Sequence, residues 1–214
     1  MTIRTQALRD RLVADLQPVE PLAGWRPSLA LALALAAALA SVALGPGVRP
    51  DLLELQPHPV AVLRSGMLLL LGVVAGEATI AGASPRISGT GRAWQVALAA
   101  GMLFPLAAIL RGVADPAGAW QAMATPSGLS CLAVSLSVAL ALATILTLWL
   151  RRGAPASPER SGLLAGLAAG ALGGFVFSFR CPENDVAYIG LWYSMAVGIS
   201  AVAGRIVISR LVRW

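Results

Sequence analysis

The chain has 214 residues, of which 57% are hydrophobic and only 12% are charged. A soluble domain of this length needs a charged surface, and this composition does not supply one. The net charge of +6 rests on 16 basic residues, all arginine, which flank apolar segments and form no patch with interleaved aromatic residues. We therefore exclude direct binding to nucleic acid and interpret the charge as a signal of membrane topology.

Residues 1–25 form the one substantial polar segment ahead of the apolar part of the chain. Apolar residues recur there at spacings of about three to four, and arginines and aspartates fill the other faces. The apolar positions are Ile3, Ala7, Leu8, Leu12 and Leu16. The pattern predicts a short amphipathic helix that ends at Gln17-Pro18 and leads into a proline-rich link. Such a helix either lies on a bilayer surface or docks in a groove of a cytoplasmic partner.

Residues 26–214 form the second predicted domain, which contains six apolar segments. At a rise of 1.5 Å per residue, segments of about 17–23 residues cross a hydrocarbon core of about 30 Å. Helices are the expected form because unpaired backbone groups are costly in lipid. The sequence therefore predicts an all-α fold, a polytopic membrane bundle of six transmembrane helices. The segments are Pro27–Gly45, Val62–Ala81, Ala93–Arg111, Gly128–Leu150, Gly162–Ser178 and Ile189–Ser209.

The arginines set the predicted orientation of these segments. One side of the bilayer receives the N-terminus, the second and fourth connections and the C-terminus, and it collects 12 of the 16 arginines. The exceptions are Arg49, Arg64, Arg111 and Arg180. By the positive-inside rule, both termini are cytoplasmic, and the connections Pro46–Ala61 and Gly112–Ser127 are exported together with the loop that holds Cys181.

The one histidine of the chain, His58, lies between two prolines in the first exported connection. A histidine in this setting is ordinarily a solvated loop residue. As a metal ligand it would need partner ligands, and the sequence does not identify them.

Glu77 and Pro105 support an alternative function, a small ion or solute transporter or channel. Glu77 is an ionisable residue at depth, which indicates a proton or ion path by default. It lies about one turn from the predicted cytoplasmic interface, however, where it can also pair with Arg86 or Arg92. Pro105 is the one proline inside a segment and predicts a kink. A transporter is expected to carry more intramembrane polar groups than these.

The fifth segment carries a glycine every four residues. The positions are Gly162, Gly166, Gly170 and Gly174. This tandem small-xxx-small face predicts the close approach of another helix. That helix belongs either to the same bundle or to a second copy of the chain, so a homo-oligomer stays open.

Both cysteines are predicted at the exported ends of their segments, Cys131 in the fourth and Cys181 just past the fifth. The exported side is oxidising, so a disulfide-capable pair is one interpretation. A soft-metal thiolate site and two inert packing cysteines are the others. Arg180 would favour a thiolate at Cys181, while Glu183 and Asp185 would oppose it.

The sequence carries no motif for catalysis. It has no phosphate-binding glycine loop, no cluster of metal ligands and no nucleophile–histidine–acid set with suitable spacing. We therefore expect neither an enzyme nor a bound cofactor.

Three parts of the chain form a recognisable combination. They are Leu12-Val13-Ala14-Asp15-Leu16-Gln17-Pro18-Val19 with the proline-rich link, Gly128–Cys131, and Cys181-Pro182-Glu183-Asn184-Asp185 with Trp192 downstream. Together they resemble the NrsF-like membrane anti-sigma factors of proteobacteria. The resemblance covers nearly the whole chain. It implies a six-span protein of the bacterial inner membrane that holds an extracytoplasmic-function sigma factor inactive.

The resemblance also implies roles for particular residues. Leu8, Leu12, Asp15 and Leu16 would contact the sigma factor, and the lipid bilayer would be the second partner. Cys131 and Cys181 would sense heavy metal or oxidant outside, with a metal held by these two thiols as one form of sensing. Modification of the thiols would change helix packing across the last three segments and release the sigma factor.

Overall fold

The computed structural model describes residues 25–45, 47–83, 93–153 and 155–212, and every regular element in these ranges is a helix. Five helices are long and apolar enough to cross a membrane. They are α2 (Trp25–Leu44), α4 (Pro59–Gly82), α8 (Ser127–Leu150), α9 (Pro158–Ser178) and a continuous helix over Val186–Val212. The last consists of α10 (Val186–Ala203), a π-helical turn η1 (Gly204–Ile208) and α11 (Ser209–Val212). The predicted all-helical fold is confirmed in these ranges.

The third predicted segment is broken. It forms α5 (Ala93–Gly101) and α6 (Leu103–Ala114), with a turn at Met102 between them. Pro105 explains the break, because its ring has no N–H to donate to the carbonyl of Gly101 and crowds that carbonyl. A further helix, α7 (Pro116–Met123), folds back from the end of α6. The described residues thus contain five helices that are long and apolar enough to cross a membrane, and a sixth crossing through α5 and α6 stays a prediction.

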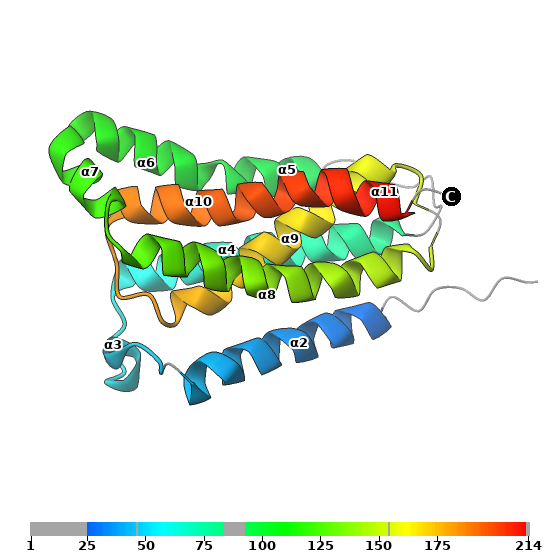
Figure 1. Cartoon of the computed structure of the whole chain (residues 1–214), viewed down its shortest axis with the longest axis horizontal. Coiled ribbons are helices and arrows are strands. Elements are labelled where there is room, and N and C mark those ends of the chain that lie inside the picture. Colours follow the sequence, from blue (N-terminus) through cyan, green and yellow to red (C-terminus); the bar gives the residue numbers. More distant parts are fainter. Residues whose placement is uncertain (1–24, 46, 84–92, 154, 213–214) are drawn as a thin grey trace, which may run out of the picture.

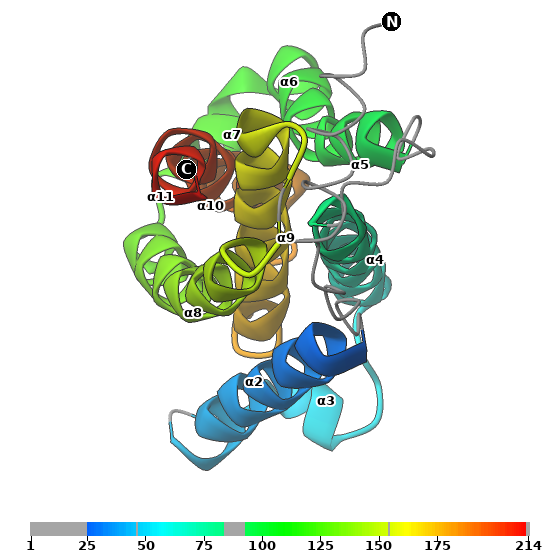
Figure 2. The ribbon, with the colours of Figure 1, turned by 90° about the vertical axis from the view of Figure 1, so that its right-hand side faces the viewer.

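Helix α9 occupies the centre of the bundle. Viewed from one end, α4, α8 and α10 surround it, whereas α2 lies at the periphery (Figure 2). Nearly every residue of α9 is buried, but α2 buries only Pro27, Leu31 and Val42. The core of the protein is therefore built around the helix that leads into Cys181.

The glycines of α9 allow α10 to pack against its backbone. A Cβ atom at Gly170 would lie 2.8 Å from the Cβ of Ser200 and 2.9 Å from the Cα of Val197, closer than real side chains approach. A Cβ atom at Gly162 would lie 3.1 Å from the backbone nitrogen of Ser209. The predicted small-residue face is confirmed as a contact within the bundle.

The helices run between two ends of the bundle (Figure 1). One end, which we call the Cys181 end, holds α3 (Pro50–Leu53), α7, the start of α8 and the connection between α9 and α10. The other, the Arg151 end, holds the start of α2, the end of α4, the connection between α8 and α9, and α11. This grouping of the connections agrees with the grouping predicted from the arginines, and the side that each end faces stays a prediction.

Candidate functional site

Cys131 and Cys181 lie in one buried cluster at the Cys181 end. Cys131 is near the start of α8, and Cys181 follows the end of α9. Both side chains are 0% exposed, both are free thiols, and they are near enough to interact electrostatically. The fold thus brings together the two residues that the sequence placed on one face.

Two tyrosines of α10 complete this group, which we call the thiol cluster: Cys131, Cys181, Tyr188 and Tyr193. Both tyrosine side chains are fully buried, and their hydroxyls lie close enough to the thiols to interact with them. The buried side chain of Ser135 lies beside Cys131. Buried polar groups depend on such polar neighbours, because they are out of reach of bulk water. The cluster is polar in chemistry although it is sealed in an apolar core.

A single arginine of α4 joins the thiol cluster to the backbone around Cys181. The side chain of Arg64 is only 2% exposed. Its Nη1 donates to the carbonyl of Glu183 at 2.8 Å, and its Nη2 donates to the carbonyls of Ser178 at 3.2 Å and Cys181 at 3.4 Å. Its guanidinium carbon lies 5.0 Å from the centre of the Tyr193 ring, a cation–π distance. One side chain thereby fixes the connection between α9 and α10.

Arg64 has no carboxylate partner among the ion pairs of the described residues. A buried cation is costly unless dipoles or charges compensate it, and here three carbonyls and a ring face provide the compensation. A positive charge beside a thiol favours the thiolate, whereas burial opposes it. The sequence suggested Arg180 for the first effect, but Arg180 is exposed, and the buried cation that interacts with Cys131 is Arg64.

Two further arginines hold the ends of the same connection. The backbone N–H of Arg49 donates to the carbonyl of Phe179 at 3.0 Å, and its side chain donates to the Asn184 side-chain oxygen at 3.3 Å. The side chain of Arg111 lies 3.9 Å from the carboxylate of Asp185, which also caps the start of α10. The connection that carries Cys181 is therefore held from three other segments.

These arginines are the residues that the sequence reasoning missed. Three of the four exceptions to the arginine bias, Arg49, Arg64 and Arg111, bind the Cys181 connection. Their departure from the arginine bias is the sequence signal that points to them, although Arg180, the fourth exception, is exposed.

Glu77 joins two helices at the Arg151 end. Its side chain is exposed and accepts a hydrogen bond from the hydroxyl of Ser28 at 3.0 Å, which links α4 to the start of α2. The predicted pairing with Arg86 or Arg92 lies outside the described residues.

His58 is exposed and caps α4, and its Nδ1 accepts a hydrogen bond from the backbone N–H of Val60 at 3.3 Å. This capping role fits a loop histidine. Within the described ranges, no three histidine, cysteine or acidic side chains lie close enough together to hold a metal ion. The two thiols alone offer the soft ligands that soft metals favour. The predicted sigma-factor contacts Leu8, Leu12, Asp15 and Leu16 lie outside the described residues.

The sequence matches the family described as "Negative regulator of sigma F" (NrsF) over residues 12–214. It is 30% identical over 229 aligned positions to the anti-sigma-F factor NrsF of Caulobacter vibrioides, covering 99% of this chain and 100% of that protein. It is also 38% identical over 61 positions to a probable anti-sigma-F factor NrsF of Azospira oryzae, covering 28% of this chain and 29% of that one. No solved structure matches the chain. The match along almost the entire length shows that the chain belongs to the NrsF family of anti-sigma factors.

Proposed function

We propose that this chain is an inner-membrane anti-sigma factor that holds an extracytoplasmic-function sigma factor and releases it when heavy metal or oxidant reacts with Cys131 and Cys181. Family membership supports the regulatory role. The observation that carries the sensing role is the burial of both thiols in one cluster beneath a connection held by Arg64. Because the thiols are sealed, a reaction there has to change the packing around them.

In this proposal the chain crosses the bilayer six times, with α5 and α6 together as the interrupted third crossing. Both termini and the Arg151 end face the cytoplasm, and the Cys181 end is exported. This orientation places residues 1–25 in the compartment that contains the sigma factor. An amphipathic helix there presents Leu8, Leu12, Asp15 and Leu16 to a groove on the partner.

The chemistry at the thiol cluster takes one of two forms. In oxidation, the two thiols lose two protons and two electrons to the oxidant and form a sulfur–sulfur bond, and the oxidant is reduced by two electrons. In metal binding, the thiols release their protons and the two thiolates ligate a soft metal ion. A disulfide requires the two free sulfur atoms to approach to bonding distance, and a bound metal adds an ion to a buried site. Thiol modification shifts the equilibrium toward the released state only by the difference between its free-energy effects on the bound and the released states.

Helix α4 offers a direct route for this change to reach the sigma-binding segment. It carries Arg64 at the Cys181 end and Glu77 at the Arg151 end, about 20 Å apart at a rise of 1.5 Å per residue. Arg64 bonds to the connection that holds Cys181, and Glu77 bonds to Ser28 at the start of α2. Because α2 follows residues 1–24 in the chain, a shift of α4 moves the point from which the sigma-binding segment emerges.

The sensing claim is tested by replacing Cys131 and Cys181 singly with serine. Transcription from the sigma-dependent promoter is then measured with and without metal or oxidant. We expect both variants to keep repression and to lose induction, whereas Ser130→Ala, an exposed neighbour of Cys131, responds like the natural protein. Normal induction in both cysteine variants would show that the thiols are not the sensor.

The docking claim is tested separately by removing residues 1–20 and measuring whether the sigma factor still co-purifies with the chain. We expect the sigma factor to be lost from the complex. If it remains bound, the cytoplasmic connections carry the contact and the proposed role of the N-terminal helix is wrong.

A further inference from the structure

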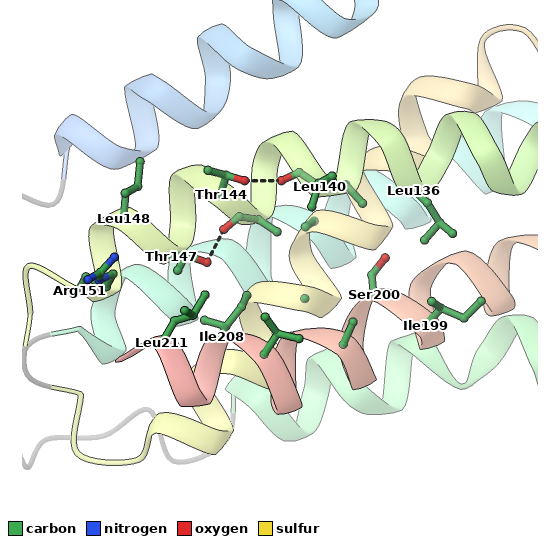
Figure 3. Close-up of a pocket in the computed structure, with 17 residues that line it drawn as sticks. Leu136, Leu140, Thr144, Thr147, Leu148, Arg151, Ile199, Ser200, Ile208 and Leu211 are labelled. Atoms are coloured by element: carbon green, nitrogen blue, oxygen red, sulfur yellow. Dashed lines mark hydrogen bonds between the residues drawn. The ribbon is translucent and has the colours of Figure 1, made fainter. Parts of the chain in front are cut away.

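An apolar groove runs along the outside of the bundle between α8 and the helix formed by α10, η1 and α11 (Figure 3). Its volume is about 440 Å³, which falls in the range of small-molecule sites. Its floor comes from Gly166 and Ala169 of α9. We call it the α8–α10 groove, and its walls include Leu136, Leu140, Ala143, Ile199, Ala203 and Leu211.

The lining of the groove is suited to hydrocarbon. The hydroxyl groups of Thr144 and Thr147 point back to the backbone of α8, where they donate to the carbonyls of Leu140 at 2.8 Å and Ala143 at 2.7 Å. Their hydrogens are therefore not available to a ligand, and the other hydroxyl of the lining is the buried one of Ser200. The rim is apolar as well, and the side chain of Leu140 is 71% exposed on it. An occupant of this groove contacts mainly methyl and methylene groups.

One end of the groove is positively charged. Arg151 follows the last turn of α8 and lines the groove at the Arg151 end, while Leu136 lies at the opposite end (Figure 3). The side chain of Arg151 is exposed and forms no ion pair with the described residues. The groove therefore combines a long apolar channel with a single cation at its mouth.

The π-helical turn η1 forms part of one wall, through Gly204, Val207 and Ile208. A π-helical turn inserts extra backbone into an α-helix and is frequent at functional sites. Gly204 packs so closely on α9 that a Cβ atom there would lie 2.8 Å from the Cα of Gly166. The turn is thus held against the floor, and the residues after it form the wall that faces α8.

We propose that the α8–α10 groove binds one acyl chain of an anionic phospholipid whose phosphate pairs with Arg151. Leu136 and Arg151 are about 22 Å apart along α8 at a rise of 1.5 Å per residue, which exceeds one leaflet of a core of about 30 Å. The cytoplasmic leaflet is the one rich in anionic lipid. The proposal rests on the membrane location proposed above and is independent of the thiol sensor.

A second copy of the chain fits the groove less well than a lipid does. A helix from another copy could cover the apolar walls, but it would leave Arg151 at the mouth without an anion. In a two-fold dimer the groove would also face the same groove of the partner and bring like charges together. The phosphate and the acyl chain of one lipid match both parts of the site.

The test uses the full chain, purified in mild detergent and depleted of lipid, and native mass spectrometry to count bound molecules. The probes are dioleoyl phosphatidylglycerol, which is anionic, and dioleoyl phosphatidylcholine, which is zwitterionic. We expect one phosphatidylglycerol to bind in preference to phosphatidylcholine. Arg151→Gln should weaken it about fivefold, which corresponds to the attraction of about 1 kcal/mol per basic residue near an anionic surface. Arg152→Gln, the exposed neighbour outside the groove, should change it little.

Variants that fill the groove test the position of the acyl chain. Ala203→Phe from α10 and Ala143→Leu from α8 should each remove the bound lipid, whereas Ala141→Phe, on an exposed position of α8 outside the groove, should keep it. Equal binding of both lipids, or equal effects of Arg151→Gln and Arg152→Gln, would refute the proposal. The proposal would also be refuted if the natural chain formed a dimer that the Ala203→Phe variant did not form. These readouts concern lipid on the isolated chain, so their failure is distinguishable from a failure of sigma-factor binding.

Discussion

Arg64 of α4 donates a hydrogen bond to the backbone carbonyl of Cys181 over 3.4 Å, so the position of a thiol after α9 depends on a different helix. The same guanidinium also binds the carbonyls of Ser178 and Glu183. Cys181 is fully buried, and a reagent reaches it only when this connection opens locally. Together with Arg49 and Arg111, Arg64 therefore contributes to the free energy of the opening that exposes the thiol.

Replacing Arg64 with leucine should speed the alkylation of Cys181 by N-ethylmaleimide at least tenfold. The change leaves three carbonyls without their donor, and a buried polar group without a partner costs about 1–3 kcal/mol. A loss of about 1.4 kcal/mol in the cost of opening corresponds to a factor of ten in rate. The rate is measured in native membranes by mass spectrometry of the Cys181 peptide.

Two control variants separate this effect from a general change in charge. Arg180→Leu removes an exposed arginine from the same connection and should leave the alkylation rate unchanged. Arg64→Lys should fall between the natural protein and the leucine variant, because one ammonium cannot reproduce the planar fork of donors. Equal rates for Arg64→Leu and Arg180→Leu would show that Arg64 does not hold the connection closed.

Loss of the Ser28–Glu77 hydrogen bond should weaken repression in unstressed cells. A hydrogen bond of this kind contributes about 1 kcal/mol, so we expect basal transcription to rise up to about fivefold in Ser28→Ala or Glu77→Ala. The double variant should be little worse than either single one, because both remove the same interaction. Promoter activity is measured without metal or oxidant. Glu54→Ala, which removes an exposed acid near the opposite end, is the control, and additive effects of the two changes would contradict the prediction.

Gly166 and Gly198 should respond in opposite directions to alanine. A Cβ atom at Gly166 would lie 2.9 Å from the Cα of Ala201, and backbone cannot rotate away, so α9 and α10 would have to separate. Overpacking of this kind costs about 1–3 kcal/mol. Gly198 of α10 has open space around it, and alanine there gains up to about 1 kcal/mol in helix propensity. Melting temperatures in detergent should fall for Gly166→Ala and hold or rise for Gly198→Ala.

Asp51 offers a test of the Arg49 contact by pH. The hydrogen bond from Arg49 holds the pKa of the Asp51 carboxyl below its ordinary value. The contribution of this pair to stability is complete above the ordinary pKa and is lost as the pH falls through the lowered pKa. Arg49→Gln should raise the pKa of Asp51 toward its ordinary value, as measured by carbon NMR of labelled aspartate. The pKa of Asp115, which is lowered mainly by the backbone N–H of Gly118, should not move.

The sequence predicted those features that depend on neighbouring residues. Segment length and hydropathy located five long helices, and Pro105 predicted a kink where the structure has a break between α5 and α6. The glycine spacing in α9 predicted a close helix contact, which α10 makes. Each of these follows from local chemistry and helical geometry alone.

The surroundings of the thiols could not be predicted in this way. The partners of Arg64 lie more than 110 residues away in the chain, so no local pattern records the contact. Tyr188 and Tyr193 have the sequence context of ordinary members of an apolar segment, because their burial and their proximity to the thiols are properties of the packed core. Counting the arginines on each side of the bilayer treats every arginine as an exposed charge, but Arg64 is buried.

The burial of α9 has a consequence for how the protein is made. Its mean hydropathy is 1.6, below the 2.4 of α8, and 94% of its apolar window is covered by other helices. With the membrane location proposed above, α9 reaches the bilayer before α10 has been synthesised, when its glycine face has nothing to pack against. We therefore expect the insertion machinery to retain α9 until α10 emerges and to release α8, α9 and α10 into the lipid as one unit.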